Sequence, residues 1–247
     1  MSRLKRPVQE NENPNPATKF LQWKSNDQCF EFYNKEAGEK VKVELPLKVL
    51  FLEHYHTVKG WSDSSNSGIW SNEVYSIGKE EFEVKSSNGT ICKGVYKDNR
   101  SIIKNAGGVY HRSIYCMTPD GEIVNLQLKG AVIGGLDADA SVDGKPVNGW
   151  SDFYSGDKKK KIKGVSHLLD NQWIEIKQAK QGKKGAVKYT IPFFELGKSI
   201  TPAEDKLANQ ASERLQNYMD SYFTKEDVKE VESIEVVLEE SLENLNF

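Results

Sequence analysis

Short segments rich in β-branched and aromatic residues, each closed by turn residues, run through most of this chain and restrict it to a fold rich in β-strands. Turns such as Asn88-Gly89 and Pro119-Asp120-Gly121 are typical of the connections in β-hairpins. We expect strands at residues 29–33, 41–43, 47–52, 67–76, 81–85, 90–93, 110–118, 122–133, 173–177 and 186–194. The sequence therefore predicts a mainly β protein.

One helix is expected among these strands, over Gly94 to Ala106. Its apolar residues recur on one face, and Gly107-Gly108 follows it as a helix C-terminal signal. The resulting order of three strands, a helix and two strands is that of an OB-fold, a five-stranded, partly open barrel that commonly binds oligonucleotides. We therefore expect an OB-fold-like five-stranded barrel with an inserted helix, an extra hairpin and a C-terminal amphipathic helix.

The composition divides the chain into four parts. Residues 1–18 are rich in Pro, Asn and Glu, and we expect a disordered arm there. Residues 19–200 form the OB-like β domain with a lysine-rich extension, and residues 201–224 form the C-terminal helix, which begins at Pro202. Residues 225–247 form an acidic tail that ends in Phe.

Charge is distributed unevenly, although the net charge is only −2. Residues 158–198 contain eleven lysines and three acids, whereas residues 226–247 contain eight acids and one lysine. A basic stretch followed by an acidic end is typical of proteins with a polyanionic partner, for which the tail can compete. The alternatives are a solvated lysine loop and a frayed surface tail, or a tail that adds a final strand or helical turn.

The end of the tail is a candidate site for a protein partner. A terminal aromatic on an acidic tether suits an apolar pocket with a basic rim. The partner-binding residues expected from this reasoning are Glu239, Glu240, Glu243 and Phe247.

Aromatic residues interleaved with cations are the pattern that most indicates a function. Single-stranded nucleic acid stacks its bases on exposed rings, while Lys and Arg neutralise its phosphates. Each ring could instead belong to the core, but Trp61 and Trp70 flank a polar loop at 62–68 and are the better candidates for exposure. The predicted DNA-binding residues are Tyr55, Lys59, Trp61, Trp70, Tyr96, Lys97, Arg112, Lys158, Lys159, Lys160, Lys161, Lys163, Lys183 and Lys184.

Motifs for enzymes and metals are absent from the sequence. There is no phosphate-binding loop, nucleophile elbow or zinc-protease motif, so we expect neither catalysis nor a cofactor. His54 and His56 would share one face of a strand but lack a third metal ligand, which favours a polar or stacking role. Residues 137–148 resemble a calcium loop, but Val142 and Asn148 replace its essential Gly and Glu.

Cysteine usage and hydropathy indicate a cytoplasmic protein. Cys29, Cys92 and Cys116 have no CxxC spacing and are odd in number, so we expect buried or half-buried thiols. No apolar run approaches the roughly 20 residues that span a bilayer, and residues 1–7 lack the apolar stretch of a secretion signal. We expect no membrane association and a location in the cytoplasm, that of the host if a phage encodes the protein.

The OB-like order, the lysine stretch, the late helix and the acidic tail ending in Phe247 together resemble the single-stranded-DNA-binding protein of T7-like phages. The resemblance implies that the barrel binds the strand, while the tail docks the polymerase and helicase-primase and shields the groove. This tail departs from the family pattern because apolar residues are mixed among its acids.

A second resemblance covers roughly residues 45–135. The motifs at 59–61, 68–74, 93–97 and 106–108 are similar to those of predicted DNA-binding proteins in replication modules of crAss-like phages. The sequence thus predicts a non-enzymatic protein that coats single-stranded DNA in bacteriophage DNA replication or recombination. Alternatives are a virion structural or interaction protein and, third, a carbohydrate-binding module.

Overall fold

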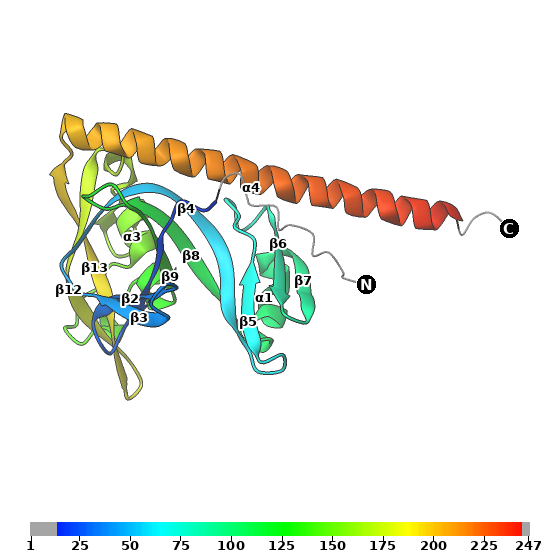
Figure 1. The fold of residues 1–247 in the computed structure, drawn as a ribbon. Helices are drawn as coiled ribbons and strands as arrows, with labels where there is room; N and C mark the ends of the chain where they lie inside the picture. The colour runs from blue at the N-terminus through cyan, green and yellow to red at the C-terminus, as the bar shows by residue number, and fades with distance from the viewer. Residues whose placement is uncertain (1–13, 244–247) are drawn as a thin grey trace. The chain divides into compact units, whose positions relative to one another are not determined.

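The computed structural model describes the backbone of residues 14–243 and the side chains of residues 14–223. The chain divides into two compact units, one formed by Ala17–Ala208 and the other by Met1–Pro16 with Asn209–Phe247. The first unit is mainly β, as the sequence predicts (Figure 1).

The strands are β1 (Lys19–Lys24), β2 (Cys29–Asn34), β3 (Glu39–Val43), β4 (Leu47–Ser62), β5 (Ser67–Ser71), β6 (Glu81–Ser86), β7 (Gly89–Val95), β8 (Gly108–Met117), β9 (Ile123–Lys129), β10 (Gly156–Asp157), β11 (Ile162–Lys163), β12 (Gln172–Lys184) and β13 (Val187–Ser199). The helices are α1 (Tyr96–Asn105), α2 (Ala131–Gly134), α3 (Trp150–Ser155) and α4 (Pro202–Glu243), with short 3-10 turns at Ala138–Ala140 and Ser166–Leu168.

Eleven strands form one open sheet, in which the order β3-β2-β1-β9-β8-β4-β5-β6-β7 is joined by β12 and β13. Only β1 and β9 pair in parallel among the described strands. One edge of β4 pairs with β12 at Val49 and with β5 at Lys59, so the sheet branches there instead of closing. The expected five-stranded OB barrel is therefore not confirmed.

Strands β4 and β8 form the long central ladder, which arches over α3, while α1 lies beside β5–β7 (Figure 1). Two apolar cores lie along it on the same face of β4. A register shift between Phe51 and Glu53 adds one extra residue to β4, so that Phe51 and Val58 share a face although side chains alternate along a strand. The larger core includes Phe51 and Trp150, and the smaller one includes Val58 and Ile103. We call this side of the β4–β8 ladder the concave face.

Helix α1 ends where the sequence predicts. Gly107 has φ +96°, a left-handed conformation that favours glycine, and its N–H bonds to the carbonyl of Lys104 at 3.1 Å. A Cβ atom at Gly60 of β4 would lie 2.2 Å from the carbonyl oxygen of Gly107. Glycine at both positions lets the end of α1 and β4 approach closely.

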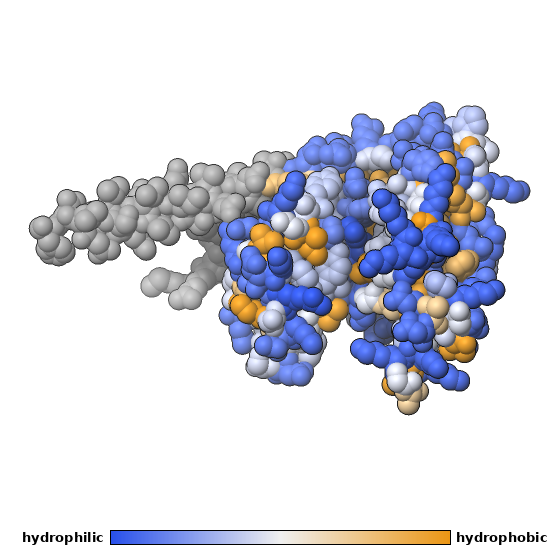
Figure 2. Space-filling model, turned by 180° about the vertical axis from the view of Figure 1, so that it is seen from behind, coloured by the Kyte–Doolittle hydropathy of each residue, from blue (hydrophilic) through white to orange (hydrophobic). Residues whose placement is uncertain are grey.

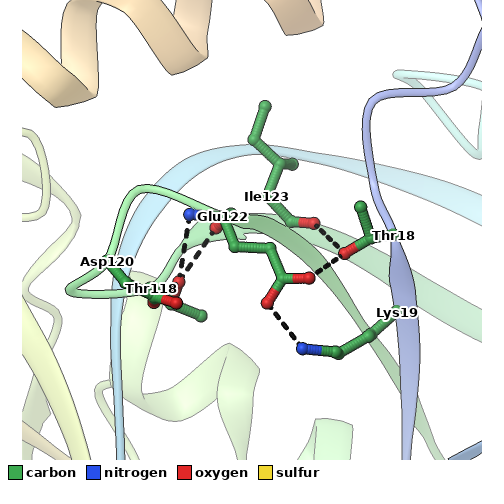
Figure 3. Close-up of polar contacts among 6 residues, drawn as sticks. All are labelled: Thr18, Lys19, Thr118, Asp120, Glu122 and Ile123. Carbon is green, nitrogen blue, oxygen red and sulfur yellow. Dashed lines mark hydrogen bonds and ion pairs between the residues drawn. The ribbon is translucent and has the colours of Figure 1, made fainter.

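Strand β1 is not predicted from the sequence, and Figure 3 shows how the start of this strand is fastened to the β8–β9 turn. The amide of Thr18 donates to the carbonyl of Ile123 at 3.0 Å. The carboxylate of Glu122 accepts the Thr18 hydroxyl and lies 2.6 Å from the ammonium of Lys19. These partners are far away in sequence, so no local pattern indicates them.

Helix α4 begins with a capping box. The amide of Thr201 donates to the Glu204 carboxylate at 2.7 Å, and the amide of Glu204 donates to the Thr201 hydroxyl at 3.3 Å. The helix continues to Glu243, well beyond the end expected near residue 224. No glycine or proline follows Pro202, and Glu and Leu, which favour helices, are frequent there.

Two further sequence expectations can be compared with the structure. Cys29 and Cys116 are buried and Cys92 is half-buried, all three as free thiols, which confirms the prediction for them. Within the described residues, no helix combines the length and the apolar character needed to cross a membrane.

Candidate nucleic-acid interface

The β4–β5 hairpin brings together the aromatic residues that flank the polar loop. Lys59 pairs with Trp70 and Trp61 pairs with Gly68, so these side chains share the face of the sheet opposite the concave face. Trp61 is 54% exposed, Trp70 is 47% exposed and Phe20 of β1 is 37% exposed. We call Phe20, Lys59, Trp61 and Trp70 the aromatic face.

Lys59 supplies the positive charge of the aromatic face. Its ammonium lies 5.2 Å from the centre of the Phe20 ring, a distance at which cation and ring attract each other. Burial lowers the pKa of Lys59, and the carboxylate of Glu73 acts in the opposite direction. Among the described residues, no carboxylate forms an ion pair with Lys59. The half-buried ammonium therefore has no counter-charge among these residues.

Tyr55 does not belong to the exposed surface, contrary to the sequence prediction. Its side chain is buried, and its hydroxyl lies 3.0 Å from that of Tyr75. Burial raises the pKa of Tyr55, and the hydrogen bond to Tyr75 raises it further. Its position on β4 matches that of Lys59 and Trp61 in the strand alternation, but its ring fills space in the protein and offers no platform for a base.

Tyr96 and Arg112, also predicted to bind DNA, lie on the concave face and so on the other side of the sheet. Arg112 donates through Nη1 to Nε2 of His56 at 2.8 Å. Nδ1 of His56 is 2.5 Å from the Tyr110 hydroxyl, and the ring centres of Tyr110 and Tyr96 are 5.4 Å apart. The predicted aromatic site is thus split by the sheet into two separate groups.

His54 and His56 share the concave face, as their spacing predicts, and both are packed against aromatic rings. The ring centres of His54 and Tyr154 are 4.7 Å apart. Burial lowers the pKa of His54 to about 4 and that of His56 to about 3, and Arg112 acts in the same direction. These values favour neutral rings, in keeping with the predicted polar or stacking role.

The lysines at 158–163 surround the turn between β10 and β11, and one of them has a structural role. Lys160 lies 2.8 Å from the Asp152 carboxylate, 3.6 Å from Asp137 and 3.9 Å from Asp157, and it also donates to the carbonyl of Gly134. Its charge is compensated within the protein, which does not favour the predicted role of Lys160 in DNA binding. Lys158, Lys159, Lys161 and Lys163 are exposed.

A second lysine cluster lies at the end of the β12–β13 hairpin. Lys183 pairs directly with Lys188 across the ladder, and Lys184 is adjacent and exposed. Like charges directly opposite each other destabilise a strand pair. An anion bound between them would relieve this repulsion.

The remaining predicted residues are on helices. Lys97 is exposed in the first turn of α1. The backbone of Glu239, Glu240 and Glu243 is part of α4, but their side chains, and Phe247 entirely, lie outside the described residues. Within the described part of the chain, no group of three or more His, Cys, Asp or Glu residues could hold a metal ion.

Phe20 is the member of the aromatic face that sequence reasoning missed. In the structure Leu21 is buried and Gln22 is exposed, but Phe20 and Leu21 are both apolar, so the sequence itself shows only a weak alternation. Phe20 comes close to Lys59 because β1 pairs with β9, which is more than a hundred residues away. A strand expectation at residues 19–24 would have placed Phe20 on one face, but no signal in the sequence selects the face that carries Lys59.

No family model, no curated protein and no solved structure matched the chain. The functional argument therefore rests on the geometry of the aromatic face and of the lysine clusters.

Proposed function

We propose that this protein is a non-enzymatic binder of single-stranded nucleic acid and that bases stack on the aromatic face. The observation that carries the proposal is the pair of exposed indoles, Trp61 and Trp70, on one side of a two-stranded ladder that also carries Lys59 on that side. Exposed rings next to an available cation are the combination that single strands require.

The spacing of the two indoles suits consecutive bases. Trp61 pairs with Gly68, and Trp70 is two residues further along β5, so the two residues are diagonal neighbours on one face. Such neighbours are about 7–8 Å apart, still within reach of large side chains. An extended strand could stack one base on each ring, while Lys59 contributes positive charge to the same face.

The aromatic face favours single strands over duplex. The bases of a duplex already stack on each other and hide their faces, whereas unpaired bases can stack on a protein ring at a gain of about 1–3 kcal/mol each. Stacking depends little on base identity, so we expect binding to tolerate any sequence. The exposed lysines of the β10–β11 turn and the β12–β13 hairpin would contact phosphates further along the strand.

The biological setting that we propose is DNA replication or recombination, in a bacteriophage. The acidic tail, residues 226–247, would dock a replication protein such as a polymerase or helicase-primase and would compete with DNA for the lysines. The separation of charge along the sequence supports this part of the proposal.

Titration of fluorescent oligo-dT with the full chain at two salt concentrations tests the function. We expect tight binding at low salt, a steep loss at high salt and much weaker binding to duplex of the same length. Binding to neutral oligosaccharides but not to oligo-dT would instead identify a carbohydrate-binding module, because sugars also stack on exposed tryptophans. Equal affinity for duplex and single strand would reject the proposal.

A further inference from the structure

The concave face carries a second polar group between the two apolar cores, on the opposite side of the sheet from the aromatic face. On β4, His54 and His56 fall between Phe51 of the larger core and Val58 of the smaller one. Figure 2 shows a cleft in the described surface between the region of β5–β7 and α1 and the rest of the sheet. The side chains of His54, His56 and Arg112 lie on the stretch of the sheet that joins these two regions.

Arg112 is held in place by a chain of hydrogen bonds. Its Nη1 donates to Nε2 of His56, and Nδ1 of the same ring then donates to the Tyr110 hydroxyl. This assignment follows from the arginine, which can only donate, so that Nε2 of His56 must accept and Nδ1 must carry the proton. The guanidinium is thus oriented by a neutral histidine.

Among the residues whose side chains are described, no anion balances the charge of Arg112. No carboxylate forms an ion pair with it among the described residues, and its Nε is a buried donor without a partner. His54 is the next residue along from His56 on the same face of β4. Its Nδ1 is also buried and has no hydrogen-bond partner among the described residues. Leaving a half-buried guanidinium without a counter-charge is costly, and an anion beside its accessible part would reduce that cost.

Aromatic rings stand on both sides of these donors. Tyr96 of α1 and Tyr110 of β8 form a ring pair on one side, and Tyr154 of α3 packs against His54 on the other. A ligand that offers both an anionic group and a flat ring would use all of these features, because aromatic pairs stabilise beyond the area that they bury.

We propose that the concave face binds a nucleotide, with its phosphoryl group at the accessible part of the Arg112 guanidinium and its base against the tyrosine rings. A guanidinium presents a planar fork of donors that matches phosphate oxygens. The nucleotide could be free or could belong to a bound strand, and the two sources share this chemistry. The site is separate from the aromatic face, so the two proposals can fail independently.

The test is calorimetric titration of the full chain with dTMP, thymidine, inorganic phosphate and oligo-dT. We expect dTMP to bind more tightly than thymidine or phosphate alone, because each of these lacks half of the ligand. Arg112→Gln should weaken dTMP binding at least tenfold. Lys104→Gln, which removes an exposed charge from α1, should leave dTMP binding unchanged.

The oligo-dT arm distinguishes the two sources. A loss of oligo-dT affinity in Arg112→Gln assigns the site to a nucleotide of the strand, and an unchanged affinity assigns it to a free nucleotide. No dTMP binding by the unaltered chain, or equal dTMP binding by Arg112→Gln, would overturn the proposal. Inorganic phosphate binding as tightly as dTMP would overturn the role of the tyrosine rings.

A second measurement avoids any dependence on how the variant folds. Phenylglyoxal modifies accessible arginines, and mass spectrometry reports the extent at each position. In the unaltered chain, dTMP should slow the modification of Arg112 and leave Arg100 and Arg214 unaffected as internal references. Equal rates at Arg112 with and without dTMP would contradict the proposed site.

Discussion

Lys59 and Trp70 are paired directly across the β4–β5 ladder, so a cation and an exposed indole lie side by side on one face of the sheet. A strand whose bases stack on Trp70 would cross a face that also carries the positive charge of Lys59. Stacking and charge neutralisation are thereby combined at one point of a rigid hairpin.

Replacement of an exposed indole is the direct test of this arrangement. We expect Trp61→Ala and Trp70→Ala each to lower oligo-dT affinity by about 1–3 kcal/mol, because one stacking platform is lost. The free energy of unfolding of both variants should stay within about 0.5 kcal/mol of that of the original protein, since the rings are exposed. Fluorescence titration and urea unfolding measure the two effects.

Tyr33→Ala is the matched control for these variants. Tyr33 is 59% exposed on β2, outside the aromatic face, and its loss should leave oligo-dT affinity unchanged. If Tyr33→Ala weakens binding as much as Trp61→Ala does, stacking is not localised to the β4–β5 hairpin.

Replacement of two neighbouring lysines, Lys159 and Lys160, by alanine should change the free energy of unfolding by very different amounts. Lys160→Ala leaves the buried Asp152 carboxylate without its cation, which should lower the free energy of unfolding by about 3 kcal/mol. Lys159→Ala removes an exposed charge and should change it by at most about 0.5 kcal/mol. Urea unfolding of the two variants under the same conditions gives the comparison, and equal stabilities would show that the Lys160 network contributes nothing.

The buried histidines predict that stability decreases in mild acid. Burial lowers the pKa of His54 to about 4, of His56 to about 3 and of His111 to about 4, whereas an unfolded histidine titrates near 6.5. Between these values the unfolded chain binds more protons than the folded one. The contribution is therefore fully present above about pH 6.5 and is lost as the pH falls towards about 4.

Urea midpoints at pH 7 and pH 5 check this expectation, because most carboxylates remain ionised over that interval. In His111→Gln the decrease in stability from pH 7 to pH 5 should be smaller than in the original protein, since one titrating group is gone. His167→Gln, at an exposed position, serves as the control and should reproduce the original decrease. An identical decrease in His111→Gln and the original protein would contradict the assignment to buried histidine.

Deletion of residues 226–247 should tighten oligo-dT binding, most clearly at low salt. The deletion removes eight acids and one lysine. The excess negative charge of this segment can compete with phosphate for the basic stretch, and salt screens that competition. Deletion of Phe247 alone should leave DNA affinity unchanged but abolish capture of a replication partner, because the aromatic anchor is lost while the charge stays. Identical salt curves with and without the tail would reject autoinhibition.

The parts of the fold that depend on local signals were predictable from the sequence. The hairpin β6–β7 follows from Asn88-Gly89, and the end of α1 follows from Gly107. The pairing of β1 with β9 and the two partners of β4 on one edge join residues that are far apart in the chain. No local pattern carries that information, so a barrel was expected where the sheet stays open.

The candidate site, too, could be predicted only where a local sequence pattern indicates it. Trp61 and Trp70 were recognisable because a polar loop between them must face solvent. The side of the sheet that carries Arg112 depends on its register with His56, and the ion pairs of Lys160 depend on how α3 is placed. In the sequence Lys160 is indistinguishable from the lysines on either side, because only its folded surroundings give it a different role.

Strand β4 contributes to both apolar cores and forms ladders with β8, β12 and β5. If either core unfolds, β4 loses hydrogen bonds and packing contacts. Because β4 also contributes residues to the other core, that core is destabilised as well. The two halves of the sheet are therefore expected to lose structure together, as a single cooperative unit, and the amide hydrogens of Val49 and Val58 should exchange with solvent through the same global opening.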